Sequence, residues 1–108
     1  MKSDKSEEKV QILTEINKLI HEPARLMIIS LLYVVESADF VWIKGQTGLT
    51  DGNLSSHLSK LESAGYVTVE KRIKNKKTNT LIKLSKGGRK AFEEYRKKLT
   101  QILASTDN

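Results

Sequence analysis

The residues best suited to chemistry in this sequence are small polar side chains along one short segment. Residues 48–67 read GLTDGNLSSHLSKLESAGYV, and Leu54, Leu58 and Leu61 recur there at the spacing of one helical face. The opposite face and its flanks carry polar groups: Ser56, Ser59, Lys60 and Ser63 opposite, with Asn53 and Ser55 at the flanks. Small polar side chains let a helix approach a groove closely and contact phosphates or base edges. This face is therefore a candidate nucleic-acid reader, the alternative being a solvated Ser-rich surface.

A second group of candidates is basic. Residues 71–98 hold twelve Lys or Arg against two Glu, a net charge of +10, whereas residues 1–22 have a net charge of −1. Five cations fall within seven consecutive positions: Lys71, Arg72, Lys74, Lys76 and Lys77. Each is suited to neutralise a phosphate, and an arginine also fits a narrow minor groove. The alternative is a charge run that only solvates an edge strand. Lys44 and Arg25 are weaker candidates for contacts with a nucleic-acid backbone.

Catalytic and metal chemistry find little support in the sequence. The chain has no cysteine and two isolated histidines, His21 and His57, so we expect no metal, no cofactor and no disulfide. His57 borders the leucine face and is predicted to be a partly buried, hydrogen-bonded residue. There is no Ser-His-acid grouping, no pair of carboxylates on a shared face and no glycine-rich phosphate loop, so we expect no enzyme.

These side chains must be positioned by a single domain over residues 1–108. Residues 1–6 read as a tail, and residues 7–21 show the apolar spacing of an amphipathic helix. Pro23 fits the first turn of a nearly all-apolar helix that extends through residue 35. Asp39 and Thr50 are predicted N-caps of two further helices, which end at Gly48 and Gly65. Two helices over residues 40–64 with a short Gly-containing turn form a helix-turn-helix arrangement.

After Gly65 the apolar period changes from 3.6 to 2. Residues 66–73 and 80–85 alternate as strands do, and residues 74–79 have turn composition, so residues 66–84 are predicted to form a hairpin with a basic tip. A last helix is predicted over residues 86–104.

Three runs resemble the winged helix-turn-helix transcriptional regulators, most closely the small MarR/ArsR-like group of archaea and bacteria. They are HEPARLMIISLLYV, LTDGNLSSHLSKLESAGYVTVEK and LSKGGRKAFEEY, and the resemblance covers roughly residues 20–96. It implies an α+β, mostly α fold: a winged helix with a β-hairpin wing and N- and C-terminal dimerisation helices. It also implies a homodimer whose second helix-turn-helix helix enters the major groove while the wing reaches the flanking backbone or minor groove. The absence of cysteine departs from the metal-sensing ArsR branch.

The terminal helices carry apolar faces that one small domain does not easily bury. We expect these faces to pair across a two-fold dimer, with core packing inside one chain as the alternative. The predicted dimerisation residues are Leu13, Ile16, Ile20, Phe92, Tyr95, Leu99 and Ile102. Trp42 is predicted to pack on the first helix or on a dimer partner, or to line a ligand cavity.

The partner predicted from these features is double-stranded DNA, bound by a transcriptional regulator in the cytoplasm. The alternative function is a winged-helix protein-interaction module whose basic wing binds an acidic partner. RNA recognition is less favoured because no exposed aromatic platform is evident. A small-molecule effector is suggested by analogy alone. No apolar run reaches the roughly 18 residues needed to cross a membrane, and the N-terminus lacks an apolar signal core.

Overall fold

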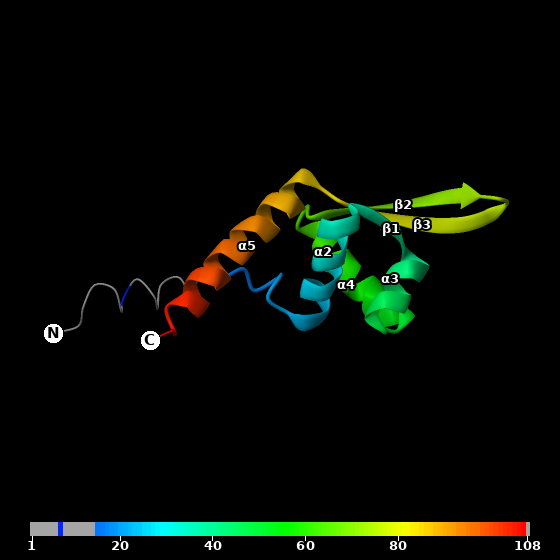
Figure 1. Ribbon diagram of the computed structural model, residues 1–108. Coiled ribbons are helices and arrows are strands. Elements are labelled where there is room, and N and C mark those ends of the chain that lie inside the picture. The colour runs from blue at the N-terminus through cyan, green and yellow to red at the C-terminus, as the bar shows by residue number, and fades with distance from the viewer. Residues whose placement is uncertain (1–6, 8–14, 108) are drawn as a thin grey trace.

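A computed structural model describes residue 7 and residues 15–107 of the chain. Its helices are α2 (Pro23–Val35), α3 (Phe40–Thr47), α4 (Asp51–Ser63) and α5 (Lys86–Ala104). Its strands are β1 (Ser37–Asp39), β2 (Val67–Lys74) and β3 (Lys77–Leu84). Helices α2, α3 and α4 gather against the base of the sheet, while the β2–β3 hairpin and α5 extend away from them in opposite directions (Figure 1). This is the winged helix fold that the sequence predicted.

The sheet is antiparallel, with the strand order β1-β3-β2. The predicted six-residue turn of the hairpin was too long. The strands pair as far as Lys74 with Lys77, so only Asn75 and Lys76 form the turn. Both have positive φ values, 53° and 62°, as a type I′ hairpin turn requires. Asn tolerates that conformation, which is why a tight turn forms without glycine.

Strand β1 was not predicted, because three residues are too few to show an alternating pattern. It pairs with β3 through Ala38 opposite Ile82. Its last residue, Asp39, is also the predicted N-cap of α3, since its carboxylate accepts a hydrogen bond from the Trp42 N–H at 2.7 Å. One side chain thus ends the strand and begins the helix-turn-helix.

The predicted ends of α4 are confirmed. The Thr50 hydroxyl accepts from the Asn53 N–H at 3.2 Å. After Ala64, Gly65 adopts a φ of 78°, and two backbone hydrogen bonds close the end of the helix, from Gly65 N–H to Glu62 and from Tyr66 N–H to Leu61. This pair of bonds is a Schellman motif, and its left-handed residue favours glycine. The composition of a loop therefore encodes the start and stop of a helix.

One hydrophobic core holds α4 in place. Leu54, Leu58 and Leu61 are almost completely buried, in a cluster that includes Ile28, Ile29 and Leu32 of α2 and Val67 and Ile82 of the sheet. Full burial of such a side chain contributes about 1.5–3 kcal/mol. The three leucines therefore anchor α4 and leave its other face outward.

The helix predicted over residues 7–21 is wrong in its second half. Residues 15–22 form turns and bends, whereas residues 8–14 lie outside the described residues. The Asn17 side chain accounts for the break. It accepts from the Ile20 N–H at 3.1 Å and donates to the Tyr66 hydroxyl at 2.9 Å, so it competes with helical hydrogen bonding and ties the segment to the sheet.

Helix α5 begins as predicted, capped by Ser85, whose hydroxyl accepts from the Gly88 N–H at 2.9 Å. Burial corrects the dimerisation prediction for four side chains. Ile16, Ile20, Phe92 and Tyr95 are at most 8% exposed and belong to the core of one chain. For these four residues the structure therefore supports core packing within one chain, which is the alternative to pairing across a dimer. Leu99 and Ile102 are partly buried against the core, Leu103 is 58% exposed, and Leu13 lies outside the described residues.

Candidate nucleic-acid interface

The outward face of α4 is exposed and carries mostly small polar side chains. The five predicted reader residues on this helix are all exposed: Asn53, Ser55, Ser56, Ser59 and Lys60. Gly52, which the sequence interpretation overlooked, lies on the same face, next to Ser56 and Ser59 on a helical wheel. A Cβ added there would meet no atom within 4 Å, so nothing inside the chain requires glycine at this position. Its helical-wheel position was the signal that could have identified it.

A partly buried polar cluster orients α4 from behind. The Arg25 Nε donates to the Leu19 carbonyl at 2.6 Å, and its Nη1 donates to His57 Nδ1 at 3.1 Å. Glu22 lies 3.6 Å from the same His57 nitrogen. His57 is therefore the partly buried, hydrogen-bonded residue that was predicted. Arg25, with a side chain only 12% exposed, is not free to contact a nucleic-acid backbone, which corrects that expectation.

The carboxylate of Glu22 also caps α2. It accepts from the Arg25 N–H at 2.9 Å, and this hydrogen bond is the main reason why the pKa of Glu22 is lowered. The His57 ring and the Arg25 guanidinium lower it further. One carboxylate therefore links the start of α2 to the inner side of α4.

The N-terminus of α4 is held against α3 by an ion pair. Lys44 Nζ lies 2.8 Å from the Asp51 carboxylate, and both side chains are substantially exposed. The lysine offsets the negative charge that Asp51 would present beside Asn53. The pair therefore leaves the helix N-terminus compatible with an approaching polyanion.

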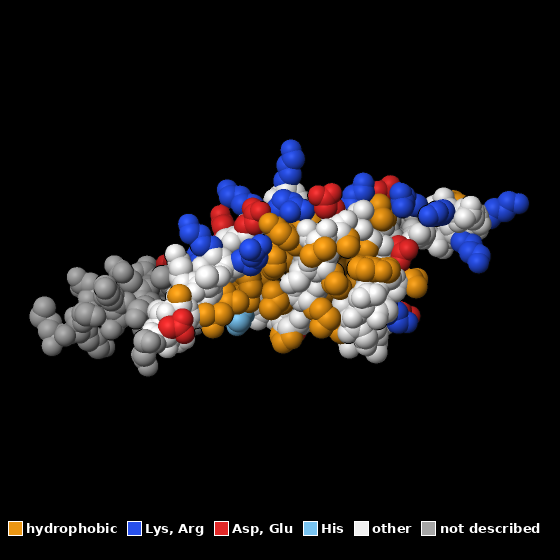
Figure 2. All heavy atoms as spheres, viewed as in Figure 1, with side chains coloured by type: hydrophobic (Ala, Val, Ile, Leu, Met, Phe, Trp, Pro, Cys, Tyr) orange, Lys and Arg blue, Asp and Glu red, His pale blue; other side chains and the backbone are white. Residues whose placement is uncertain are grey.

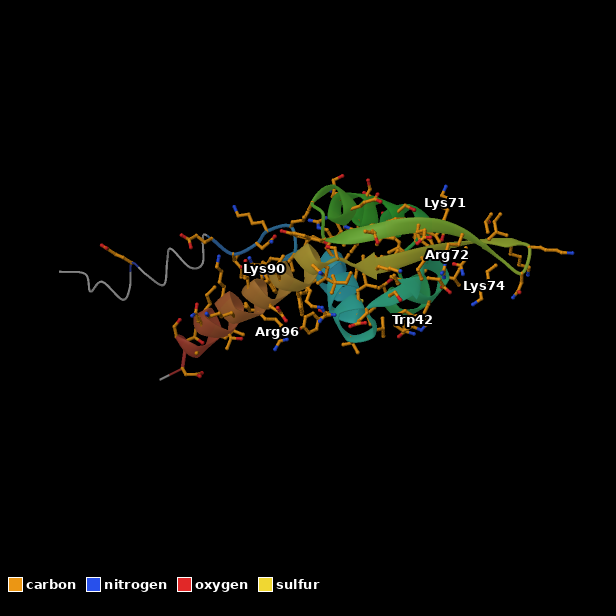
Figure 3. All side chains as sticks on the ribbon, turned by 90° about the horizontal axis from the view of Figure 1, so that it is seen from above. Trp42, Lys71, Arg72, Lys74, Lys90 and Arg96 are labelled. Carbon is orange, nitrogen blue, oxygen red and sulfur yellow. The ribbon has the colours of Figure 1, made fainter. Side chains whose placement is uncertain are left out.

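The wing carries its cations on both of its faces. Lys and Arg side chains line it along its length (Figure 2). Val69 pairs with Ile82 on the buried face, so strand alternation puts Lys71 on that side and Arg72 and Lys74 on the other. Figure 3 shows Lys71 and Lys74 pointing to opposite sides of the hairpin. Alternation along residues 66–73 already predicts Lys71 and Arg72 on opposite faces. The structure puts Lys74 and Lys77 on the same face as Arg72, and Lys76 in the turn.

Lys71 is the wing cation that meets α4. A shallow recess is lined by Ser55, Ser59 and Glu62 of α4 and by Val69, Lys71 and Thr80 of the wing. The structure thus brings two predicted reader serines and one predicted phosphate contact to the same groove. The other wing cations extend beyond it toward the hairpin tip.

Trp42 is 38% exposed and lines a separate shallow recess with Val35, Ser37, Ala38 and Asp39. Its neighbours in that recess are thus the end of α2 and strand β1.

In the part of the chain that the structure describes, no three His, Cys, Asp or Glu side chains come together as metal ligands would. Nor does any described helix combine the length and apolar character needed to cross a membrane.

The sequence of the chain matches a known family over most of its length. Residues 24–103 match the winged helix DNA-binding domain family, so the chain belongs to it. The chain is also 38% identical over 85 residues to the uncharacterized protein MJ0432 of Methanocaldococcus jannaschii, covering 79% of this chain and 92% of that one. The class that the fold and the exposed face of α4 define is therefore a DNA-binding regulator and not an enzyme.

Solved structures agree with this assignment. The transcriptional regulator homologue from Pyrococcus horikoshii OT3 superposes with a TM-score of 0.85 at 26% identity, covering 94% of this chain and 99% of that one. NadR, solved in complex with 4-hydroxyphenylacetate, shares the fold with a TM-score of 0.66 at 21% identity and covers 97% of this chain and 82% of its own. These neighbours are transcriptional regulators of the MarR family, as the sequence resemblance indicated.

Proposed function

We propose that the protein is a sequence-specific regulator that binds double-stranded DNA as a homodimer, with α4 in the major groove and the wing on the flanking backbone or minor groove. The observation that carries the proposal is the recess where Ser55 and Ser59 of α4 face Lys71 of the wing. At this recess the polar face of α4 meets the basic hairpin. A duplex bound over the recess would therefore contact both elements.

Helix α4 has the side chains of a reader. Asn53 is exposed in its first turn, where recognition helices contact base edges, and an amide offers a donor and an acceptor to adenine. Ser55, Ser56 and Ser59 add small hydroxyl groups, and Gly52 allows the helix backbone to approach. Lys60, one turn further, suits a phosphate.

The wing supplies affinity. It extends beyond the helices (Figure 1). Its five predicted phosphate contacts are all exposed: Lys71, Arg72, Lys74, Lys76 and Lys77. A hairpin inserted into a minor groove has one strand of DNA on each side, so cations on both of its faces suit this position. Lys76, in the turn, would enter deepest.

The proposed dimer uses the C-terminal part of α5. Leu99, Ile102 and Leu103 retain apolar surface where α5 extends beyond the domain (Figure 1). Pairing of this surface across a two-fold axis would bury it. The two copies of α4 would then contact half-sites about 10 base pairs apart.

The experiment is a selection of bound duplexes from a random pool. We expect enriched sequences with inverted half-sites centred about 10 base pairs apart. Asn53→Ala and Ser56→Ala should change which bases are enriched, whereas Thr100→Ala, at an exposed position of α5, should leave them unchanged. An unenriched pool would overturn sequence-specific binding and would favour the alternative of a module for an acidic protein partner.

A further inference from the structure

The proposed DNA contacts leave more than half of the cations of the basic segment without a role. Seven cations follow the five wing candidates along the chain. Six of them are here called the basic ridge: Lys83, in β3, and Lys86, Arg89, Lys90, Arg96 and Lys97, in α5. Five of them are exposed, and Arg89 is partly so. Figure 2 shows Lys and Arg side chains along the upper edge of the molecule, from α5 to the wing, with Asp or Glu side chains at several places between them.

The basic ridge faces away from α4. Lys83 follows Ile82 in β3, and since Ile82 is fully buried with the α4 leucines, Lys83 points from the opposite face of the sheet. On α5, the buried Phe92 and Tyr95 turn toward the core, so Lys86, Lys90 and Lys97 lie on the outer side of the helix. Lys90 and Arg96 are both seen on α5 in the view from above (Figure 3). A duplex held by α4 is therefore on the other side of the core.

The ridge is continuous at the junction of sheet and helix. Lys83, Lys86 and Arg89 line one recess of about 370 Å³ together with Glu36, whose carboxylate lies 3.6 Å from Arg89. The nearby Glu93 carboxylate accepts from the Tyr33 hydroxyl at 2.7 Å. These two acids are thus engaged within the chain, and none of the described ion pairs involves Lys83, Lys86, Lys90 or Lys97. Glu94, the other acid of α5, is exposed one helical turn from Lys90.

The length of the ridge suits a duplex. From Lys86 to Lys97 the helix rises about 17 Å, roughly half of the 34 Å helical repeat of DNA. Arg89 and Arg96 lie over the Tyr33 ring, at 4.5 and 5.7 Å, so the arginines also pack while the lysines extend. The ridge has no exposed aromatic ring to stack an unpaired base, because the Tyr33 ring is covered by these guanidinium groups. The partner indicated is thus a phosphate backbone in double-stranded form.

We infer that the basic ridge binds a second segment of double-stranded DNA, without sequence preference, on the side of the protein opposite α4. Each chain would then contact two duplex segments and bridge or bend them together. This goes beyond the proposed function, which needs only α4 and the wing. The apolar surface at Leu99 and Ile102 lies on another side of α5, so the proposed dimer leaves the ridge accessible.

The test is a bridging assay. A duplex with the selected site is fixed to beads, the full chain is bound to it, and capture of a second, fluorescent duplex of unrelated sequence is measured at low salt. Wild type should capture it. The variant Lys83→Gln/Lys86→Gln/Lys90→Gln/Lys97→Gln should bind the bead duplex as well as wild type but capture at least about tenfold less of the second. The matched Lys→Arg variant at the same four positions should capture as wild type does.

Each other outcome is decisive. Equal capture by wild type and the Gln variant would overturn the inference, since bridging would then come from two copies of α4. Bead binding without any capture would overturn it while leaving the proposed function intact. The same capture can be measured with a fluorescent single-stranded RNA in place of the second duplex. Preferential capture of that RNA over duplex would also overturn the inference. Failure of the wild type to bind the bead duplex would instead count against the proposed function.

Discussion

Gly88 lies where α5 leaves the sheet, and replacing it by alanine tests the packing that positions the wing. A Cβ at this position would clash with the Tyr66 carbonyl oxygen and would lie 2.8 Å from Leu84 Cδ1. The Tyr66 carbonyl is backbone at the start of the wing and also accepts from the Ser85 N–H at 3.0 Å. The clash cannot be relieved by a side-chain rotation, so α5 must move.

The expected change in the free energy of unfolding is the sum of three contributions. Overpacking of this kind destabilises by about 1–3 kcal/mol. Weakening of the Ser85 hydrogen bonds to Tyr66 and Gly88 adds about 1 kcal/mol, whereas the better helix propensity of alanine returns about 1 kcal/mol. We therefore expect Gly88→Ala to lower the free energy of unfolding by about 2 kcal/mol.

The adjacent glycine is the matched control. A Cβ at Gly87 would lie 3.4 Å from the Gly65 carbonyl oxygen and 3.7 Å from Ser85 Oγ, which are ordinary contacts. Gly87→Ala should therefore leave stability unchanged or raise it by about 0.5–1 kcal/mol. Urea unfolding followed by circular dichroism measures both variants. A Gly88→Ala protein within about 0.5 kcal/mol of wild type would refute the packing at this junction.

Three further predictions concern the recognition helix, the hairpin tip and the start of α2. Gly52→Ala should raise stability by about 0.5–1 kcal/mol in urea unfolding yet weaken binding of the selected duplex; unchanged binding would contradict close approach at this position. Lys76→Gly should stabilise the chain by about 1 kcal/mol, because glycine adopts the φ of 62° at this position without the strain of a side chain. Lys76→Gln should not change stability in this way. In duplex titrations both variants should lose the same phosphate contact. The lowered pKa of Glu22 contributes stability that is present above its unfolded-state pKa and lost as the pH falls through its folded-state pKa. Thermal unfolding of Glu22→Gln should therefore depend less steeply on pH in this acidic range, and an unaltered profile would exclude this role.

Helix ends and the main apolar faces were predictable because they are local. Thr50, Gly65 and Asp39 cap by contacts within a few residues, and Leu54, Leu58 and Leu61 show their period directly. Strand β1 was not predictable, since its pairing partner Ile82 is far along the chain. The break at Asn17 was missed for the same reason, because its partner Tyr66 belongs to the wing.

The candidate site was predicted residue by residue but not in its arrangement. Exposure of Asn53, Ser56 and Lys60 follows from the helical period alone. The separation of Lys71 from Arg72 and Lys74 follows from the alternation of β2, whereas the position of Lys77 opposite Lys74 depends on a turn of two residues where composition indicated six. The burial of Arg25 depends on His57 and on the Leu19 carbonyl, which only the folded chain brings together.

The most direct test of the central claim is the salt dependence of duplex binding. The affinity of the full chain for the selected duplex is measured by fluorescence anisotropy over a series of salt concentrations. Neutralisation of about five phosphates by each of the two wings predicts that log affinity of the homodimer falls against log salt with a slope of about −9. In Lys74→Gln/Lys77→Gln, which removes two cations from each wing, the magnitude of the slope should be smaller by about 4. A flat salt response, or no binding at the lowest salt, would contradict the account.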